Sequence, residues 1–164
     1  MRNISNQKEL LVTVDSDLRM TEDYIAIQKM RFRERLHVEI DIDSETRNRM
    51  IPRISIQPLV ENSVKYVMEE QLSSCSIRIF DRIGSEFTEI IVEDNGAGFD
   101  EDIMGKIESG VLSAHGNGTA LLNIHKRLRY AFSDPCGLSF RKQKDGMQVI
   151  IRIPNSIDGI RSKV

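Results

Sequence analysis

One segment of the chain brings a carboxylate, a carboxamide and an ammonium group onto the same face of an expected helix. At about 100° per residue, Glu61, Asn62, Lys65 and Glu69 fall together on one arc of a helix expected over residues 55–70. An amide oxygen can ligate Mg²⁺, and a lysine can pair with the oxygens of a phosphate held by that metal. Any solvated helix face can also be polar, so this pattern alone leaves both interpretations open.

A second candidate site follows an apolar run that ends at Asp94. Residues 92–100 read VEDNGAGFD. Gly96 and Gly98 would let the backbone approach a planar ligand closely, and the Asp94 carboxylate could accept the exocyclic amino hydrogens of adenine. A tight turn explains the same glycines equally well. An EF-hand loop and a dinucleotide fingerprint both fail on spacing, because Gly98 and Glu101 stand where their required residues would be.

A third candidate lies directly ahead of an amphipathic segment. Residues 116–121 read GNGTAL, and helical spacing continues over residues 119–132. A glycine segment that opens onto a helix N-terminus offers N–H groups and the positive end of the helix dipole, which suit a phosphate. No Gly-Lys-Ser/Thr follows, so the segment is not a P-loop. Glycine-rich loops before helices are common, and the motif is weak by itself.

The elements that must position these segments alternate between helical and strand periodicity. Helices are expected over residues 17–35, 55–70 and 119–132, and strands over residues 37–43, 76–82, 87–93, 137–142 and 147–153. Residues 95–118 are expected to be glycine-rich and irregular. Strands that come in adjacent pairs predict an α/β (α+β) two-layer sandwich, with a mixed, largely antiparallel sheet of about five strands and helices on one face.

Composition limits the class of protein. The 164 residues include 23 Lys and Arg against 25 Asp and Glu, for a net charge of −2. This balance argues against a nucleic-acid arm or a polybasic membrane patch. No apolar run approaches the roughly 20 residues of a membrane span, so we expect this piece to be soluble. The N-terminus lacks a secretory signal, and the two cysteines and three histidines show no metal spacing, so we expect a reducing compartment.

Taken together, the three segments resemble the ATP site shared by gyrase, MutL and sensor histidine kinases, in particular the LytS/YesM-type sensor histidine kinases. Residues 57–65, QPLVENSVK, are similar to the N box of that family and residues 94–99 to its first glycine box. Residues 116–121, with Asn123, Arg127 and Leu128, are similar to its second glycine box. Residues 24–32, YIAIQKMRF, resemble the helix that precedes the ATP-binding domain. The resemblance covers nearly everything over residues 15–154, and the N box with the first glycine box is a specific pair.

The resemblance implies a Bergerat-type ATP-binding fold and a role for each matching position. Asn62 would hold Mg²⁺, Asp94 would bind the adenine amino group, and Glu61 would orient or polarise the attacking imidazole. Residues 99–117 would form a short ATP lid. The cofactor-binding positions that the resemblance implies are Asn62, Lys65, Asp94, Gly96, Gly98, Gly116, Gly118 and Thr119.

Three positions depart from the family pattern. Ala120 replaces the last glycine of the second box, and Tyr66 replaces the usual histidine after the N-box lysine. Met147 stands where a threonine often follows the glycine of the penultimate turn, and this removes a hydroxyl that supports the adenine-binding aspartate. These departures predict either weak nucleotide binding or a lid that orders only with its partner.

The histidine that such a kinase phosphorylates is not expected in this piece. In the family it lies in an upstream His-Phe segment, and none of His37, His115 and His125 has that neighbour. We therefore expect the substrate histidine on a missing upstream helix, and we do not expect the isolated piece to phosphorylate itself.

The expected organisation follows from these points. Residues 1–14 would be a connector, residues 15–36 a leading helix from the dimerisation and phosphoacceptor region, residues 37–156 the ATP-binding catalytic domain and residues 157–164 a tail. The resemblance implies a protein-histidine kinase that passes the ATP γ-phosphoryl group to that histidine and then to a response-regulator aspartate. It further implies a homodimeric, bacterial inner-membrane receptor with this domain in the cytoplasm.

Two other classes of function stay open. The departures at Tyr66, Ala120 and Met147 would also fit a nucleotide-dependent interaction module that has lost catalysis. A serine kinase of the anti-sigma type shares the boxes but should lack the leading segment with Gln28 and Arg31, so it ranks lower.

Overall fold

The computed structural model describes residues 10–69, 73–109 and 118–157. The elements in chain order are β1 (Leu11–Thr13), α2 (Val14–Phe32), the short 3-10 helix η1 (Arg33–Arg35), β2 (Leu36–Asp41), α3 (Ser44–Arg47), β3 (Met50–Pro52), α4 (Gln57–Glu69), β4 (Cys75–Ile83), β5 (Phe87–Asp94), α5 (Glu101–Ser109), α6 (Thr119–Phe132), β6 (Gly137–Gln143) and β7 (Gly146–Pro154). The helices and strands expected from periodicity are all present, with small shifts at their ends.

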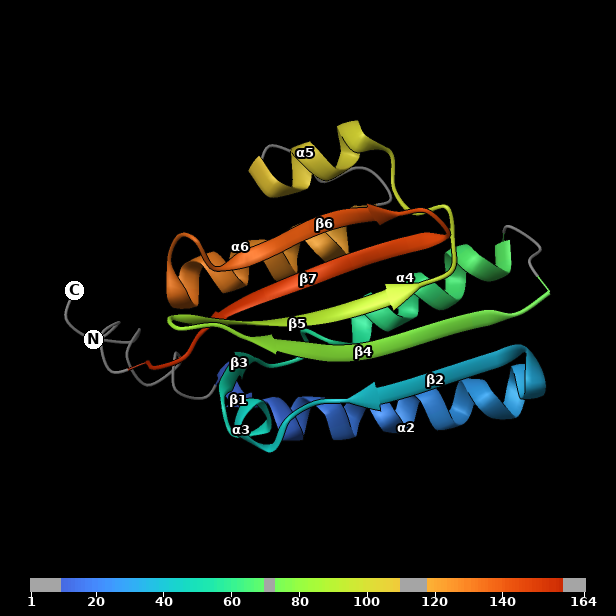
Figure 1. Ribbon diagram of the computed structural model, residues 1–164, viewed down its shortest axis with the longest axis horizontal. Coiled ribbons are helices and arrows are strands. Elements are labelled where there is room, and N and C mark those ends of the chain that lie inside the picture. The colour runs from blue at the N-terminus through green and yellow to red at the C-terminus, as the bar shows by residue number, and fades with distance from the viewer. Residues whose placement is uncertain (1–9, 70–72, 110–117, 158–164) are drawn as a thin grey trace.

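Five strands form one sheet in the order β2-β4-β5-β7-β6. The β2–β4 pair is parallel, and the β4–β5, β5–β7 and β6–β7 pairs are antiparallel. Helices α2, α4 and α6 lie together on one face of this sheet, behind the strands in Figure 1. The predicted two-layer sandwich with a mixed, largely antiparallel sheet is confirmed.

The core fills the space between the sheet and these three helices. Alternate residues of the strands point towards the helices because strand side chains have a period of two. Fully buried members include Leu18 on α2, Val60 and Val67 on α4, Ile79 on β4, Ile90 and Val92 on β5, Leu121 and Leu128 on α6, and Ile151 on β7. Each such side chain contributes roughly 1.5–3 kcal/mol relative to an exposed one, so the position of α4 on the sheet is well determined.

A second, two-stranded sheet lies beside the start of α2. Strand β1 pairs antiparallel with β3, and Thr13 ends β1 and caps α2 by accepting a 3.1 Å hydrogen bond from the Ser16 N–H. Strand β1 lies within the segment 1–14, which the sequence suggests is a connector. The leading helix is therefore anchored at its N-terminal end, through β1, to the strand that precedes α4.

Helix α5 corrects the sequence-based expectation that residues 95–118 are irregular. The Asp100 side chain accepts a 2.9 Å bond from the Asp102 N–H at the start of the helix, and Lys106 forms a 2.6 Å ion pair with Asp102 one turn away. Ile107 is fully buried and Ile103 packs against the core. The flanking glycines conceal this short amphipathic pattern in the sequence.

Among the residues that the structure describes, no helix is both long and apolar enough to cross a membrane.

Candidate functional site

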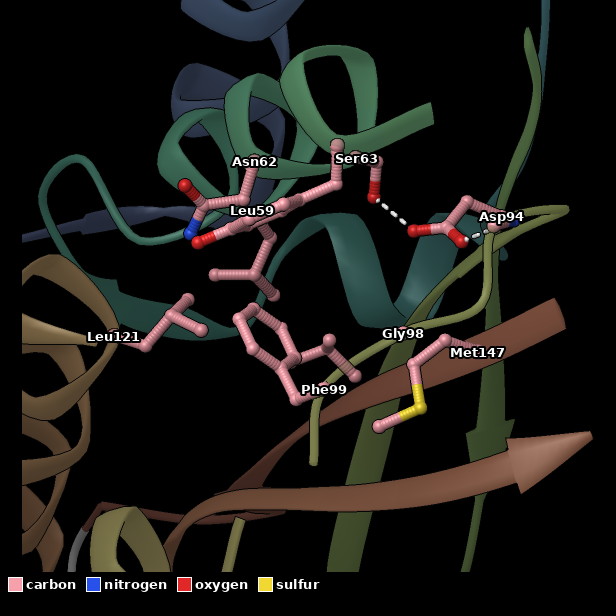
Figure 2. A pocket seen from close by; sticks show the side chains of 11 residues that line it. Leu59, Asn62, Ser63, Asp94, Gly98, Phe99, Leu121 and Met147 are labelled. Atoms are coloured by element: carbon pink, nitrogen blue, oxygen red, sulfur yellow. Dashed lines mark hydrogen bonds between the residues drawn. The ribbon is translucent and has the colours of Figure 1, made fainter. Parts of the chain in front are cut away.

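A pocket forms where α4 faces the end of β5. Figure 2 shows side chains from α4, the segment after β5, α6 and β7 converging on it. Its lining consists of Leu59, Asn62, Ser63 and Tyr66 from α4, Asp94 at the end of β5, Gly96, Gly98 and Phe99 from the segment after it, Leu121 from α6, and Met147 and Val149 from β7. The N box and the first glycine box are thus brought together, as the spacing of the sequence motifs requires.

Two hydrogen bonds fix the carboxylate of Asp94. The Ser63 hydroxyl donates to Oδ2 at 2.6 Å, and the Gly96 N–H donates to Oδ1 at 2.9 Å. One donor comes from α4 and the other from the loop after β5, so the rotation of the carboxyl group is held from two sides (Figure 2). A half-buried carboxylate in this position can accept hydrogen bonds from a ligand amino group.

Glycine is required at two positions around this carboxylate. Gly98 has a φ of +77°, and a Cβ there would lie 2.8 Å from the Met147 sulfur. A Cβ on Gly146 would lie 2.0 Å from the carbonyl oxygen of Asp94. Side chains at either position would clash, so Gly98 and Gly146 both allow the backbone to pass close to Met147 and Asp94.

Aromatic and thioether side chains fill most of the pocket. Tyr66 and Phe99 meet edge to face with centroids 5.2 Å apart, and Phe99 meets Phe140 in the same way at 5.8 Å. Figure 2 shows the Phe99 ring pointing into the space below α4, with Met147 beside it. The remaining cavity is about 10 Å³, roughly enough for one water molecule. A planar base would therefore have to displace side chains such as Phe99.

The polar arc of α4 is divided between the pocket and solvent. Asn62 lines the pocket, and its buried Nδ2 has no hydrogen-bond partner within the described part of the chain. Glu61 is exposed and accepts a 2.9 Å bond from Gln57, while Lys65 is exposed with its Nζ 5.8 Å from the centroid of the Tyr66 ring. Only Asn62 of these three is directed into the pocket.

The unpartnered Nδ2 of Asn62 is a hydrogen-bond donor and fits an acceptor such as a phosphate oxygen, whereas the Oδ1 of the same amide is the atom that could ligate a metal. A buried carboxamide with an unused atom costs free energy unless something binds it. Among the described residues, no group of three or more histidine, cysteine, aspartate or glutamate side chains could hold a metal ion. A metal here would thus depend on Asn62 together with oxygens supplied by the ligand, which is how Mg²⁺ is usually bound beside phosphates.

Glu61 lies on the side of α4 that faces the leading helix. Burial raises the pKa of Tyr24 on α2, and the nearby charge of Glu61 raises it further. Helices α2 and α4 also pack directly against each other. The charge of Glu61 therefore lies close enough to α2 to act on the Tyr24 hydroxyl.

The second glycine segment is only partly described. Gly118 is buried and caps α6 without a side-chain hydrogen bond, and the first turn of α6 contains no acidic residue. Thr119 is half-buried at the first helical position. This helix end keeps the positive dipole that suits an anion. Gly116 and residues 110–117 of the predicted lid over residues 99–117 lie outside the described residues, whereas residues 99–109 are described and include α5.

The sequence gives little indication of a buried junction at the base of α4, here called the Asp17 clamp and made of Asp17, residues 53–56 and Arg127. Asp17 is 1% exposed and accepts backbone N–H bonds from Ile54, Ser55 and Ile56 at 2.6, 3.1 and 2.9 Å. The bonded N–H groups lie just ahead of α4, where a helix lacks internal acceptors. The clamp thus fixes where α4 begins.

Arg127 completes the clamp from α6. Its guanidinium donates to the carbonyl oxygens of Arg53 and Ile54 at 2.5 and 2.8 Å. Burial lowers the pKa of Arg127, and the charge of Asp17 opposes that shift. Ile54 has a φ of +59°, which is rare for a β-branched residue, so its backbone conformation is held by Asp17 on one side and Arg127 on the other.

No protein-family model matches the chain. The fold is similar to the catalytic domain of the histidine kinase ThkA in a nucleotide-free form, with a TM-score of 0.66, 16% identity, and coverage of 88% of this chain and 96% of that one. It is also similar to ThkA crystallised with the response regulator TrrA, with a TM-score of 0.61, 15% identity, and coverage of 89% and 41%. The fold is that of a histidine kinase catalytic domain.

Curated relatives agree with the fold. The chain is 35% identical over 155 residues to the sensor histidine kinase YesM of Bacillus subtilis (strain 168). The matched region spans 94% of this chain and 26% of that relative. The chain is also 30% identical over 154 residues to the sensor protein LytS of Staphylococcus haemolyticus (strain JCSC1435), covering 93% and 26%. The chain spans about a quarter of the length of these relatives. It is thus related to the YesM/LytS-type sensor histidine kinases, as its motifs indicate.

Proposed function

We propose that this chain is the ATP-binding catalytic part of a sensor histidine kinase. It binds Mg²⁺ and ATP in the pocket below α4 and transfers the γ-phosphoryl group to a histidine carried outside residues 1–164. The observation that carries the proposal is the Asp94 carboxylate, held by Ser63 and Gly96 at the mouth of a pocket that also contains the unpartnered amide of Asn62.

Each pocket residue then has a defined task. Asp94 accepts the amino group of adenine, while Gly96 and Gly98 leave room for the ring. Asn62 holds the metal, which when bound neutralises charge on the phosphate oxygens. Gly118 and Thr119 present the N-terminus of α6 to the phosphates, with Gly116 expected to add a backbone N–H. Lys65 is exposed on α4 and meets the phosphates.

The transfer step is catalysed mainly by positioning and charge neutralisation. The imidazole nitrogen attacks the γ-phosphorus, the bond to the bridging oxygen breaks, and ADP leaves. Glu61 faces the leading helix and orients the incoming imidazole. The phosphoryl group then passes to an aspartate of a response regulator. The intact protein is a homodimer whose catalytic part lies on the cytoplasmic side of a bacterial inner membrane.

Calorimetric titration with ATP and Mg²⁺ tests the site. We expect saturable binding to the 164-residue chain, and Asp94→Ala should weaken it by roughly 10-fold to 100-fold because a hydrogen bond to a charged group is worth about 1.5–3 kcal/mol. Glu22→Gln, at an exposed position on α2, is the matched control and should bind like the wild type. Absence of binding at millimolar ATP, or an Asp94→Ala variant that binds normally, would refute the assignment.

A second function is favoured by the small size of the pocket. With Phe99 and Met147 filling the space, the chain could serve as an interaction module that responds to nucleotide without transferring phosphate. Labelled ATP and a supplied upstream segment containing the His-Phe motif separate the two functions. Robust phosphorylation of that segment would exclude the module.

A further inference from the structure

The two walls around Asp94 differ in polarity. On the β7 side, the backbone partner of Asp94 is Met147, which is 1% exposed and whose sulfur packs against Gly98. A thioether has no hydrogen to donate. On the α4 side stands Ser63, 4% exposed and otherwise surrounded by the apolar face of its helix. The hydroxyl that approaches the carboxylate therefore comes from the helix and not from the strand.

The bond from Ser63 is short and charge-assisted. Its oxygen lies 2.6 Å from Asp94 Oδ2, within the 2.5–2.7 Å expected of a hydroxyl that donates to a carboxylate. A buried hydroxyl on a helix could have bonded to its own backbone instead. Here it bonds to a side chain 31 residues away, on another element. Together with the Gly96 N–H on Oδ1, this bond sets the plane of the carboxyl group.

We propose that Ser63 is the positioning residue that sets base selectivity, by holding Asp94 so that it faces the exocyclic amino group of a 6-aminopurine. This inference rests on the proposed function. The hydroxyl replaces, from the opposite wall, the one that Met147 removes. A purine with a carbonyl at that position would place its oxygen against the fixed carboxylate and bind less well. Selectivity for the amino group is therefore greatest when the carboxyl cannot turn away.

The test compares the binding of ATP and of inosine triphosphate, each with Mg²⁺, to the 164-residue chain by calorimetry. For Ser63→Ala we expect ATP to bind about tenfold more weakly and inosine triphosphate to change less than about threefold, because one charge-assisted bond is lost and the carboxyl is freed to turn. The preference for ATP over inosine triphosphate should therefore decrease. In Ser63→Ala with Met147→Thr, a hydroxyl returns on the β7 side, and the preference should recover.

Thr88→Val is the matched control. Thr88 is fully buried on β5, the strand that carries Asp94, but its hydroxyl bonds to the Asn155 side chain at 2.7 Å at the far end of the strand. Its loss should lower stability without changing the preference. Thermal unfolding of every variant confirms that it is folded.

The outcomes distinguish a failure of the proposed function from a failure of the role proposed for Ser63. Failure of the wild type to bind ATP would contradict the proposed function itself. If the wild type binds ATP, either of two results would overturn the role of Ser63 alone. In the first, Ser63→Ala changes the preference for ATP over inosine triphosphate by less than about twofold. In the second, Thr88→Val reduces that preference as strongly as Ser63→Ala does.

Discussion

Two aspartates hold different parts of this molecule in place: Asp17 fixes the start of α4, and Asp94 lies at the edge of the pocket. Asp17 is 1% exposed, and its two oxygens accept three backbone N–H groups at the start of α4. Asp94 is half-buried, is fixed by one hydroxyl and one N–H, and faces a pocket. A carboxylate enclosed among backbone donors stabilises the fold, whereas one held at a pocket edge can bind a ligand.

The comparison predicts effects of different size for the same substitution. Asp17→Ala leaves three N–H groups without acceptors in the interior and should lower the free energy of unfolding by roughly 3–5 kcal/mol. Asp94→Ala should lower it less, by about 1–2 kcal/mol, because only one hydroxyl and one N–H lose their acceptor. Urea denaturation measures both.

Glu22→Ala on the exposed side of α2 is the control for Asp17→Ala, and it should change stability by less than about 0.5 kcal/mol. If Asp17→Ala cost no more than Asp94→Ala, the distinction between the two aspartates would be wrong.

The backbone strain at Ile54 gives a smaller effect of opposite sign. A β-branched residue at a φ of +59° is strained by about 1–2 kcal/mol, which glycine relieves while adding some freedom to the unfolded chain. Ile54→Gly should therefore stabilise the protein by roughly 0.5–1 kcal/mol. Ile83→Gly is the matched control, since both side chains are 43% exposed but Ile83 lies in β4. It should destabilise, because glycine weakens a strand.

If both glycine variants lost stability to a similar degree, Ile54 would not be strained, and the clamp would not be holding an unfavourable conformation.

The same two regions show what a sequence can predict. Helix α4 is expected over residues 55–70 from its helical periodicity, and the position of the pocket is indicated by the contiguous motif Asp94, Gly96 and Gly98. The clamp has no such pattern, because Asp17 and Arg127 meet residues 37 and 73 positions away along the chain. An aspartate near a helix start reads as an ordinary first-turn residue.

Some features of the pocket also could not be predicted from the sequence. The role of Ser63 could not be predicted from its position on α4, because its partner is 31 residues away. The Phe99 ring that fills the pocket depends on contacts with Tyr66 and Phe140 from two other elements. Pairings of this kind depend on tertiary packing, which periodicity does not encode.

Helix α6 offers the smallest test, because it joins the clamp through Arg127 and the sheet through His125. The Leu138 N–H donates to His125 Nδ1 at 2.9 Å, which requires a neutral ring. Burial, aided by the charge of Arg129, lowers the pKa of His125 below its usual 6.5. The folded protein thus binds fewer protons than the unfolded chain below about pH 6.5, so stability should be constant above that pH and fall as the pH is lowered through it.

Urea denaturation at pH 7.5 and 5.5 measures the loss, and His125→Gln, which cannot titrate, should show a smaller one. Because Asp17 and Arg127 do not depend on this proton, Asp17→Ala should lower stability by the same amount at both pH values. If His125→Gln lost as much stability between pH 7.5 and 5.5 as the wild type does, another group would be responsible for the pH dependence.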